Sequence, residues 1–381
     1  MSKKSLIGIF IILSGGIISC VPFHKQSPER SPNFSSKRTH TYKFEGYTES
    51  YVIDRIYESM NVPKGSQEII LPGFENPELL WIVSAKVDVV GEDGKTLASP
   101  EHLCHSGLMY SKEGQNKKMA EYMADRGNKL FSLVQGRTEI RLPEGFGIPV
   151  WSNEIFSFYD MLINSRELKK PIVLRAKISL EYLRQSELQE QPKPLFRRVT
   201  TLRMPIQAGS TGAQSSHCES SAEEESIDNV KTVQVSGPSI SYNQSGQMLS
   251  EHWYVPPGRH VYRFQPGKNV FDIPFDTTVH YISPHLHPYA EWIEFKDLTT
   301  KQIIFHSQAE NYSDRPILKR SEHFSSEKGI PVYKDHEYEV ICGYDNTTSS
   351  DVDAMCSVYL YFRDKDFSTL GKGFSSDKKS N

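Results

Sequence analysis

An alternation of apolar and polar residues over residues 172–182 is the clearest periodic pattern in the chain. Every second residue from Ile172 to Tyr182 is apolar, whereas Arg175 and Lys177 lie at intervening positions. A period of two is typical of an antiparallel strand with one face in the core and the other in solvent. No helical period is sustained for long, and residues 115–125 are the best helix candidate. The pattern predicts an all-β protein.

A second alternation lies near the end of the chain and predicts another strand. One face carries Met355, Ser357, Tyr359 and Tyr361, and the other carries Cys356, Val358, Leu360 and Phe362. A methionine at the head of the less apolar face is unusual for a strand with a purely structural role.

A polar segment at residues 207–237, which contains the acidic run 223–225, interrupts the strand patterns. Its composition is typical of a linker or a long exposed loop. The segment separates residues 41–206 from residues 238–366, and each part has about the size of one β-sandwich. We therefore expect two consecutive antiparallel jelly-roll-like β-sandwich domains, followed by a polar tail at residues 367–381.

The first twenty residues have the pattern of a secretion signal. Lys3 and Lys4 precede an apolar stretch that ends in Ile17-Ile18-Ser19-Cys20, and this ending resembles the lipobox of bacterial lipoproteins. The resemblance implies a signal peptide at residues 1–19, acylation of Cys20 and a tether at residues 20–40. It also implies attachment to the lipid bilayer of a bacterial envelope. Val21 after the cysteine resembles the pattern that sorts lipoproteins to the outer membrane. The protein would then face the periplasm or the cell surface.

Composition narrows the possible functions. Of 381 residues, 37% are hydrophobic and 24% are charged, which excludes a wholly disordered chain. The net charge is −3, so we expect no nucleic-acid partner. Besides Cys20, the chain has Cys104, Cys218, Cys342 and Cys356, and four cysteines in an oxidising compartment allow three pairings.

A metal site is the chemistry that the sequence indicates best. His285 and His287 are two residues apart, so on a strand both imidazoles project to the same face and can reach one ion. Together with the thioether of Met355 they form a donor set that suits copper, because the sulfur favours Cu(I) while imidazole accepts both oxidation states.

The segment from Trp253 to Phe362 resembles the catalytic core of the copper type II, ascorbate-dependent monooxygenases. Peptidylglycine α-hydroxylating monooxygenase and dopamine β-monooxygenase are members of that family. In the family, a His-x-His pair and a methionine some seventy residues later bind the oxygen-activating copper. Here Met355 follows His287 by 68 positions.

The resemblance implies a copper monooxygenase that hydroxylates a C–H bond with dioxygen and an external reductant. A non-catalytic envelope lipoprotein that uses the fold for copper binding or partner recognition is the alternative. The family pattern also implies a disulfide between Cys342 and Cys356. Asp345 and Asp353 are the candidates to hold the ring nitrogens that do not bind copper.

The family's second copper site is altered in this sequence. Family members bind that copper with a His-His pair and a third histidine on a later strand, whereas this chain has Cys104-His105 and no histidine in residues 158–164. His105 is therefore a tentative ligand. Three alternatives stay open: a Cys104–Cys218 disulfide, an altered copper site that includes His102 or His217, or loss of the site. The sequence favours a lost or weakened site.

Overall fold

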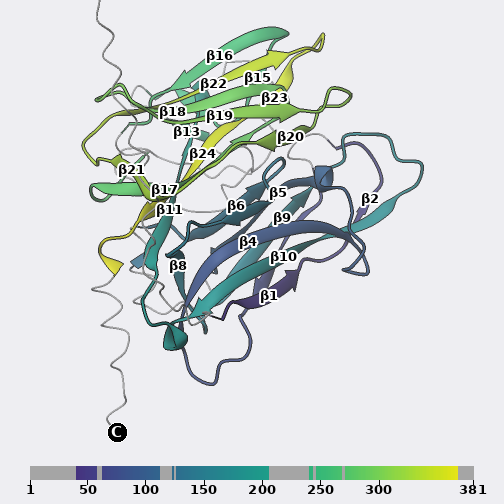
Figure 1. Ribbon diagram of the computed structural model, residues 1–381. Coiled ribbons are helices and arrows are strands. Elements are labelled where there is room, and N and C mark those ends of the chain that lie inside the picture. The colour runs from purple at the N-terminus through teal and green to yellow at the C-terminus, as the bar shows by residue number, and fades with distance from the viewer. Residues whose placement is uncertain are drawn as a thin grey trace, which may run out of the picture. The chain divides into compact units, whose positions relative to one another are not determined.

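Most of the described residues of the computed structural model lie in β-strands, and all but one of the strand pairs among them are antiparallel (Figure 1). The structure describes residues 40–57, 62–111, 122–123, 126–205, 240–242, 246–267 and 271–367. No helix in these ranges is long and apolar enough to cross a membrane. The predicted signal peptide, Cys20, the tether up to residue 39, the linker and most of the helix candidate at residues 115–125 lie outside them.

The N-terminal half of the chain forms one sandwich. Its two sheets enclose a common apolar core. The first sheet contains β1 (Tyr42–Tyr47), β2 (Tyr51–Ile53), β4 (Leu79–Gly91), β7 (Glu139–Arg141), β8 (Phe146–Trp151) and β10 (Ile172–Arg184). The second contains β3 (Lys64–Ile69), β5 (Leu103–Tyr110), β6 (Lys129–Val134) and β9 (Phe156–Leu162). Short 3-10 helices precede β5 and follow β10, at Pro100–His102 and Gln185–Glu187.

The C-terminal half forms a second sandwich with its own core. On one side, β11 (Lys193–Thr201), β24 (Cys356–Arg363), β17 (Thr277–Leu286) and β21 (Phe324–Val332) continue the first sheet beyond β8, so that both sandwiches share one ten-stranded sheet. The facing sheet contains β16 (Gly258–Phe264), β18 (Ala290–Asp297), β19 (Ile303–Asn311), β20 (Leu318–Ser321) and β22 (Tyr338–Asn346). The predicted all-β class, with two consecutive antiparallel sandwiches, is confirmed.

Two smaller sheets complete the described strands. One contains β12 (Met204–Pro205), β13 (Ile240–Tyr242) and β14 (Met248–Ser250), and the other pairs β15 (Trp253–Val255) with β23 (Val352–Ala354). The β15–β23 pair brings Trp253 opposite Ala354, so that the residues flanking this point are close together.

Strand β24 shows how side-chain alternation builds both cores. Tyr359 and Tyr361 belong to the N-terminal core, whereas Val358, Leu360 and Phe362 belong to the C-terminal core. These are the two faces that the sequence pattern predicts. The strand is therefore buried on both sides, and it is a wall shared by the two sandwiches.

Strand β11 lies on the other side of the expected domain boundary. It falls within residues 41–206, yet it pairs along its length with β24, from Leu195 opposite Arg363 to Thr201 opposite Ser357. Only Lys193 and Pro194 pair with β8 of the first sandwich, in parallel. Thus the chain enters the second sandwich before the polar segment begins, and the described residues belong to one compact unit, Thr39–Asn381.

The expected polar tail at residues 367–381 includes one residue, Phe367, that is part of the folded core. Phe367 is 1% exposed, and its ring lies edge-on to those of Trp81 and Tyr122, each at a centroid distance of 5.6 Å. An aromatic ring gains from burying its apolar area against other rings, so Phe367 belongs to the N-terminal core. The rest of the tail lies outside the described residues.

Candidate metal centre

Strands from both sandwiches bring three histidines together. His105 lies on β5 of the N-terminal sandwich, His285 lies near the end of β17 in the C-terminal sandwich, and His287 follows β17 directly. The three residues are 0%, 2% and 6% exposed. Their ring centroids are 4.4 Å apart for His105 and His285, and 5.3 Å apart for His285 and His287. One nitrogen of each ring lies within 4.8 Å of the other two.

Within the described ranges, the hydrogen bonds around these rings leave one ring nitrogen without a partner. Nε2 of His105 lies 2.9 Å from Nε2 of His285, so one ring must donate and the other accept. Nδ1 of His105 lies 2.9 Å from Sγ of Cys104, whereas Nδ1 of His285 is buried without a hydrogen-bond partner among the described residues. Burial, followed by the neighbouring imidazoles, lowers the pKa of His285 well below its ordinary value, which keeps this ring neutral.

Asp353 on β23 contacts the Nδ1 nitrogen of His287. Its Oδ2 lies 2.9 Å from Nδ1 of His287, and its Oδ1 accepts a hydrogen bond from Nδ1 of His252 at 3.2 Å. Burial alone would raise the pKa of Asp353, but the two imidazoles lower it below its ordinary value. A carboxylate behind an imidazole fixes the ring's orientation and makes the opposite nitrogen a stronger metal ligand.

The sequence left Asp345 and Asp353 as equal candidates for this role, and the structure separates them. Asp345 lies on β22 and its Oδ2 is 3.2 Å from Nε of Arg259. His252 is a further histidine beside the site. Its Nε2 is buried without a partner in the described part of the chain, and its ring lies 5.2 Å from that of His287. The only signal in the sequence was its position just before Trp253, at the start of the segment that resembles the monooxygenases.

Met355 lies beside His287 because one tyrosine binds both backbones. The hydroxyl of Tyr344 donates a hydrogen bond to the carbonyl oxygen of Met355 at 2.6 Å and accepts one from the amide of His287 at 3.3 Å. Leu286 pairs with Cys356, so His287 and Met355 are next in the same register. Met355 is 2% exposed.

Sulfur-containing side chains gather next to His105, whose Nδ1 lies 2.9 Å from Sγ of Cys104. Met355, Cys104 and Met161 form a single buried cluster with Val62. Met161 on β9 is the register partner of His105. Sequence reasoning sought a histidine in residues 158–164 and missed this methionine. The sequence contains no local signal for it, because the pairing of β9 with β5 brings it to the site.

The expected disulfide between Cys342 and Cys356 is not formed in the structure, in which both are buried free thiols. Cys342 lies on β22 and Cys356 begins β24, so the two residues belong to facing sheets rather than to neighbouring strands. The thiols meet across the core, and burial and the contact with Cys342 raise the pKa of Cys356 well above its ordinary value.

The residues of the expected second copper site have separate positions. His105 joins the C-terminal histidines, whereas Nδ1 of His102 lies 3.0 Å from the carbonyl oxygen of Ile163. His217 and Cys218 lie outside the described residues, so the pairing of Cys104 with Cys218 stays a prediction. In the described part of the chain, His105 is thus the one N-terminal histidine that the structure brings to the C-terminal cluster.

The donor set fits a first-row transition metal. Two nitrogens bound to one ion at about 2.0–2.1 Å lie about 2.8–3.4 Å apart for coordination angles between square and tetrahedral, and the His105–His285 separation between Nε2 atoms is 2.9 Å. An ion at this point would be bound by the lone pairs of both Nε2 atoms in place of the proton that they share. Imidazole and thioether donors together suit copper.

No family model matches the sequence, and no curated protein matches it. Among solved structures, the chain is similar to the major capsid protein P2 of bacteriophage PM2, with 10% identity and a TM-score of 0.30 over 83% of this chain and 97% of that one. It is also similar to the STIV MCP, with 11% identity and a TM-score of 0.30 over 86% and 99% of the two chains. At these TM-scores the likeness supports no function.

Proposed function

We propose that this protein binds one copper ion through His105, His285 and His287, with Met355 in the adjacent cluster of sulfur-containing side chains. The observation that carries the proposal is the convergence of three buried imidazoles from both sandwiches, each with a ring nitrogen within 4.8 Å of the other two.

The surroundings of the imidazoles favour Cu(I) as the bound state. The thioethers of Met355 and Met161 and the thiol of Cys104 pack together next to His105. Soft sulfur donors select Cu(I) over Cu(II) and over harder divalent ions. Asp353 orients His287, and Tyr344 holds His287 and Met355 side by side.

Copper binding without turnover is the function that this geometry supports best. The monooxygenases that the sequence resembles deliver electrons from a second copper, held by N-terminal histidines. Here the N-terminal half contributes His105 to the same cluster as His285 and His287, and all three are almost fully buried. Storage or transfer of copper in a bacterial envelope, on an acylated Cys20 that anchors the chain to the membrane, is consistent with such a site.

Hydroxylation of a C–H bond is the second candidate function. The observation that favours it is the placement of His285, His287 and Met355, the residues that the family resemblance assigns to the oxygen-activating copper. Bound copper would supply one-electron chemistry with dioxygen. The residues of this chain would hold the ion and, through their burial, exclude water from it.

Copper stoichiometry of the purified full chain tests the proposal. We expect one Cu(I) per chain after anaerobic loading, and loss of that copper in His285→Ala. A chain that retains no copper would overturn the proposal. Two copper ions per chain, together with ascorbate-dependent oxygen consumption that His105→Ala abolishes, would instead support the monooxygenase.

A further inference from the structure

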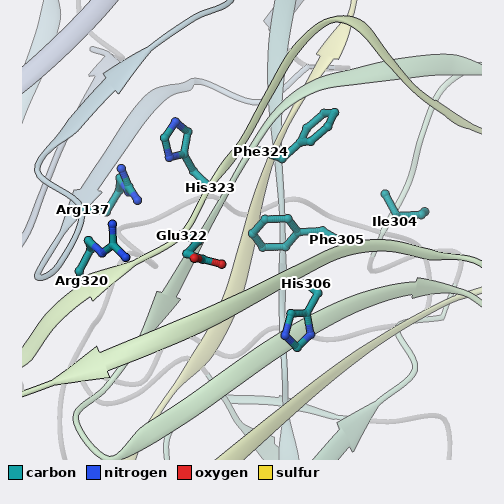
Figure 2. Close-up of a pocket in the computed structure, with 8 residues that line it drawn as sticks. All are labelled: Arg137, Ile304, Phe305, His306, Arg320, Glu322, His323 and Phe324. Atoms are coloured by element: carbon teal, nitrogen blue, oxygen red, sulfur yellow. The ribbon is translucent and has the colours of Figure 1, made fainter.

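A pocket of about 480 Å³ lies apart from the histidine cluster (Figure 2). Arg137, from the turn between β6 and β7, enters it from the N-terminal sandwich. The other lining residues belong to the C-terminal sandwich and lie on β19, on β20 and in the segment between β20 and β21, or begin β21: Ile304, Phe305, His306, Arg320, Glu322, His323 and Phe324.

Arg137 is a cation with an incomplete set of partners. Its Nη2 donates to the carbonyl oxygen of Ser321, but its Nε is buried without a hydrogen-bond partner. In the described part of the chain its guanidinium forms no ion pair within 4.0 Å. Burial lowers the pKa of Arg137, and so does Arg320, whereas Tyr281, Glu139 and Glu322 raise it. A buried guanidinium with an unsatisfied N–H attracts an anionic acceptor.

Tyr281 adds a second buried donor close to Arg137. The tyrosine is 1% exposed, and its hydroxyl has no hydrogen-bond partner among the described residues. Burial raises the pKa of Tyr281 while Arg137 lowers it, and the hydroxyl stays protonated. Its ring packs against that of His323, at a centroid distance of 5.2 Å.

The charges and the apolar wall together restrict the ligand. The guanidinium groups of Arg137 and Arg320 and the carboxylate of Glu322 line the pocket, and Nε of Arg320 also lies 3.7 Å from Oε2 of Glu310, so the local charges nearly balance. That balance suits a monoanion better than a dianion such as hydrogen phosphate. Phe305 and Phe324 present rings on the other side (Figure 2), where a hydrocarbon group gains from burial.

We propose that this pocket binds a small organic acid, with its carboxylate at Arg137 and Arg320 and its apolar group against Phe305 and Phe324. The carboxylate accepts from the guanidinium of Arg137, which is suited to planar, two-point recognition of carboxylates. The site is independent of copper and does not rest on the function proposed above.

Titration of the full chain with phenylacetate, followed by calorimetry, tests the proposal. We expect saturable 1:1 binding, and at least tenfold weaker binding of the neutral analogue 2-phenylethanol and of inorganic phosphate. Arg137→Gln should weaken phenylacetate binding at least tenfold. Arg141→Gln, which removes an exposed arginine from the nearby strand β7, should leave it unchanged.

Arg320→Gln is a second test in case the Arg137 variant misfolds. The side chain of Arg320 is 65% exposed, so its replacement should leave the fold intact. It should also weaken phenylacetate binding, with an unchanged melting temperature. Absence of phenylacetate binding to the parent protein would overturn the proposal. Equal binding of 2-phenylethanol or of phosphate, or full affinity in both arginine variants, would overturn it as well.

Discussion

His105 and His285 are 180 positions apart in the sequence, yet their Nε2 atoms are 2.9 Å apart. The contact joins β5 of the N-terminal sandwich to β17 of the C-terminal sandwich. The two halves of the fold thus share one buried group of imidazoles, and the proposed copper site would depend on how the sandwiches pack.

Removing either partner of this contact should weaken copper binding in both oxidation states. His105→Ala and His285→Ala each delete one of three nitrogen donors, so we expect Cu(I) and Cu(II) affinities to fall at least tenfold, about 1.4 kcal/mol. Competition with chromogenic chelators measures both. His306→Ala is the control, because its side chain is 40% exposed and lies on β19. Unchanged affinity in both variants would contradict the three-histidine site.

Met355→Ile should separate the two oxidation states. The volumes are similar and the site is buried, so we expect a stability cost below about 1.5 kcal/mol. Only the soft thioether is lost, and Cu(I) affinity should therefore fall about tenfold while Cu(II) affinity stays the same. Equal losses for both ions would assign Met355 a packing role instead.

The sequence predicted the faces of strands well, since alternation is a local property. On β10, Leu174, Ala176 and Ile178 are buried as expected, and the two faces of β24 point into different cores. The same locality explains the prediction that His285 and His287 would lie together. The place of β11 was missed because it depends on pairing with β24, about 160 residues later in the chain.

Long-range packing also explains the differences at the site. His105 was a tentative ligand, and nothing near it in the sequence indicates that it faces His285 rather than other N-terminal histidines. Met161 reaches the sulfur cluster through the pairing of β9 with β5. Cys342 and Cys356 lie on facing sheets, a relationship that their spacing of 14 positions does not reveal.

Asp353→Asn should weaken copper binding without removing a ligand. The amide keeps the shape of the side chain but loses the charge that orients His287, and such changes behind a metal ligand cost about 10–100-fold in affinity. The measurement is again chelator competition. Asp345→Asn is the matched control, because that carboxylate contacts Arg259. Equal effects of the two substitutions would contradict the assigned role of Asp353.

Asp364→Ala should destabilise both sandwiches together. Asp364 is buried and accepts from the hydroxyl of Tyr122 at 2.5 Å and from Nε of Arg126 at 3.1 Å, which ties the end of the second sandwich to the first. Removing one partner of a buried ion pair costs about 3–5 kcal/mol. Urea unfolding should show one transition at lower urea. Two separate transitions in the parent protein would contradict the coupling.

Asp160→Asn should change how stability depends on pH. Burial raises the pKa of Asp160 to about 7, although hydrogen bonds from Tyr51 and Thr48 lower it. Because the pKa in the folded state lies above that in the unfolded state, the folded protein holds this proton more tightly. The resulting stabilisation is complete below about pH 4 and is lost as the pH rises to about 7.

The asparagine variant has no proton to lose at this position, so its free energy of unfolding should not contain that decline. Relative to the parent protein, we expect the variant to gain about 3–4 kcal/mol between pH 4 and pH 7, because burial raises the pKa of Asp160 from its ordinary value to about 7. Urea unfolding of the copper-free proteins across this range measures the difference, in which the titration of the histidines cancels. Asp54→Asn, at an exposed carboxylate, is the control. A difference that is constant with pH would show that Asp160 is ionised throughout this range.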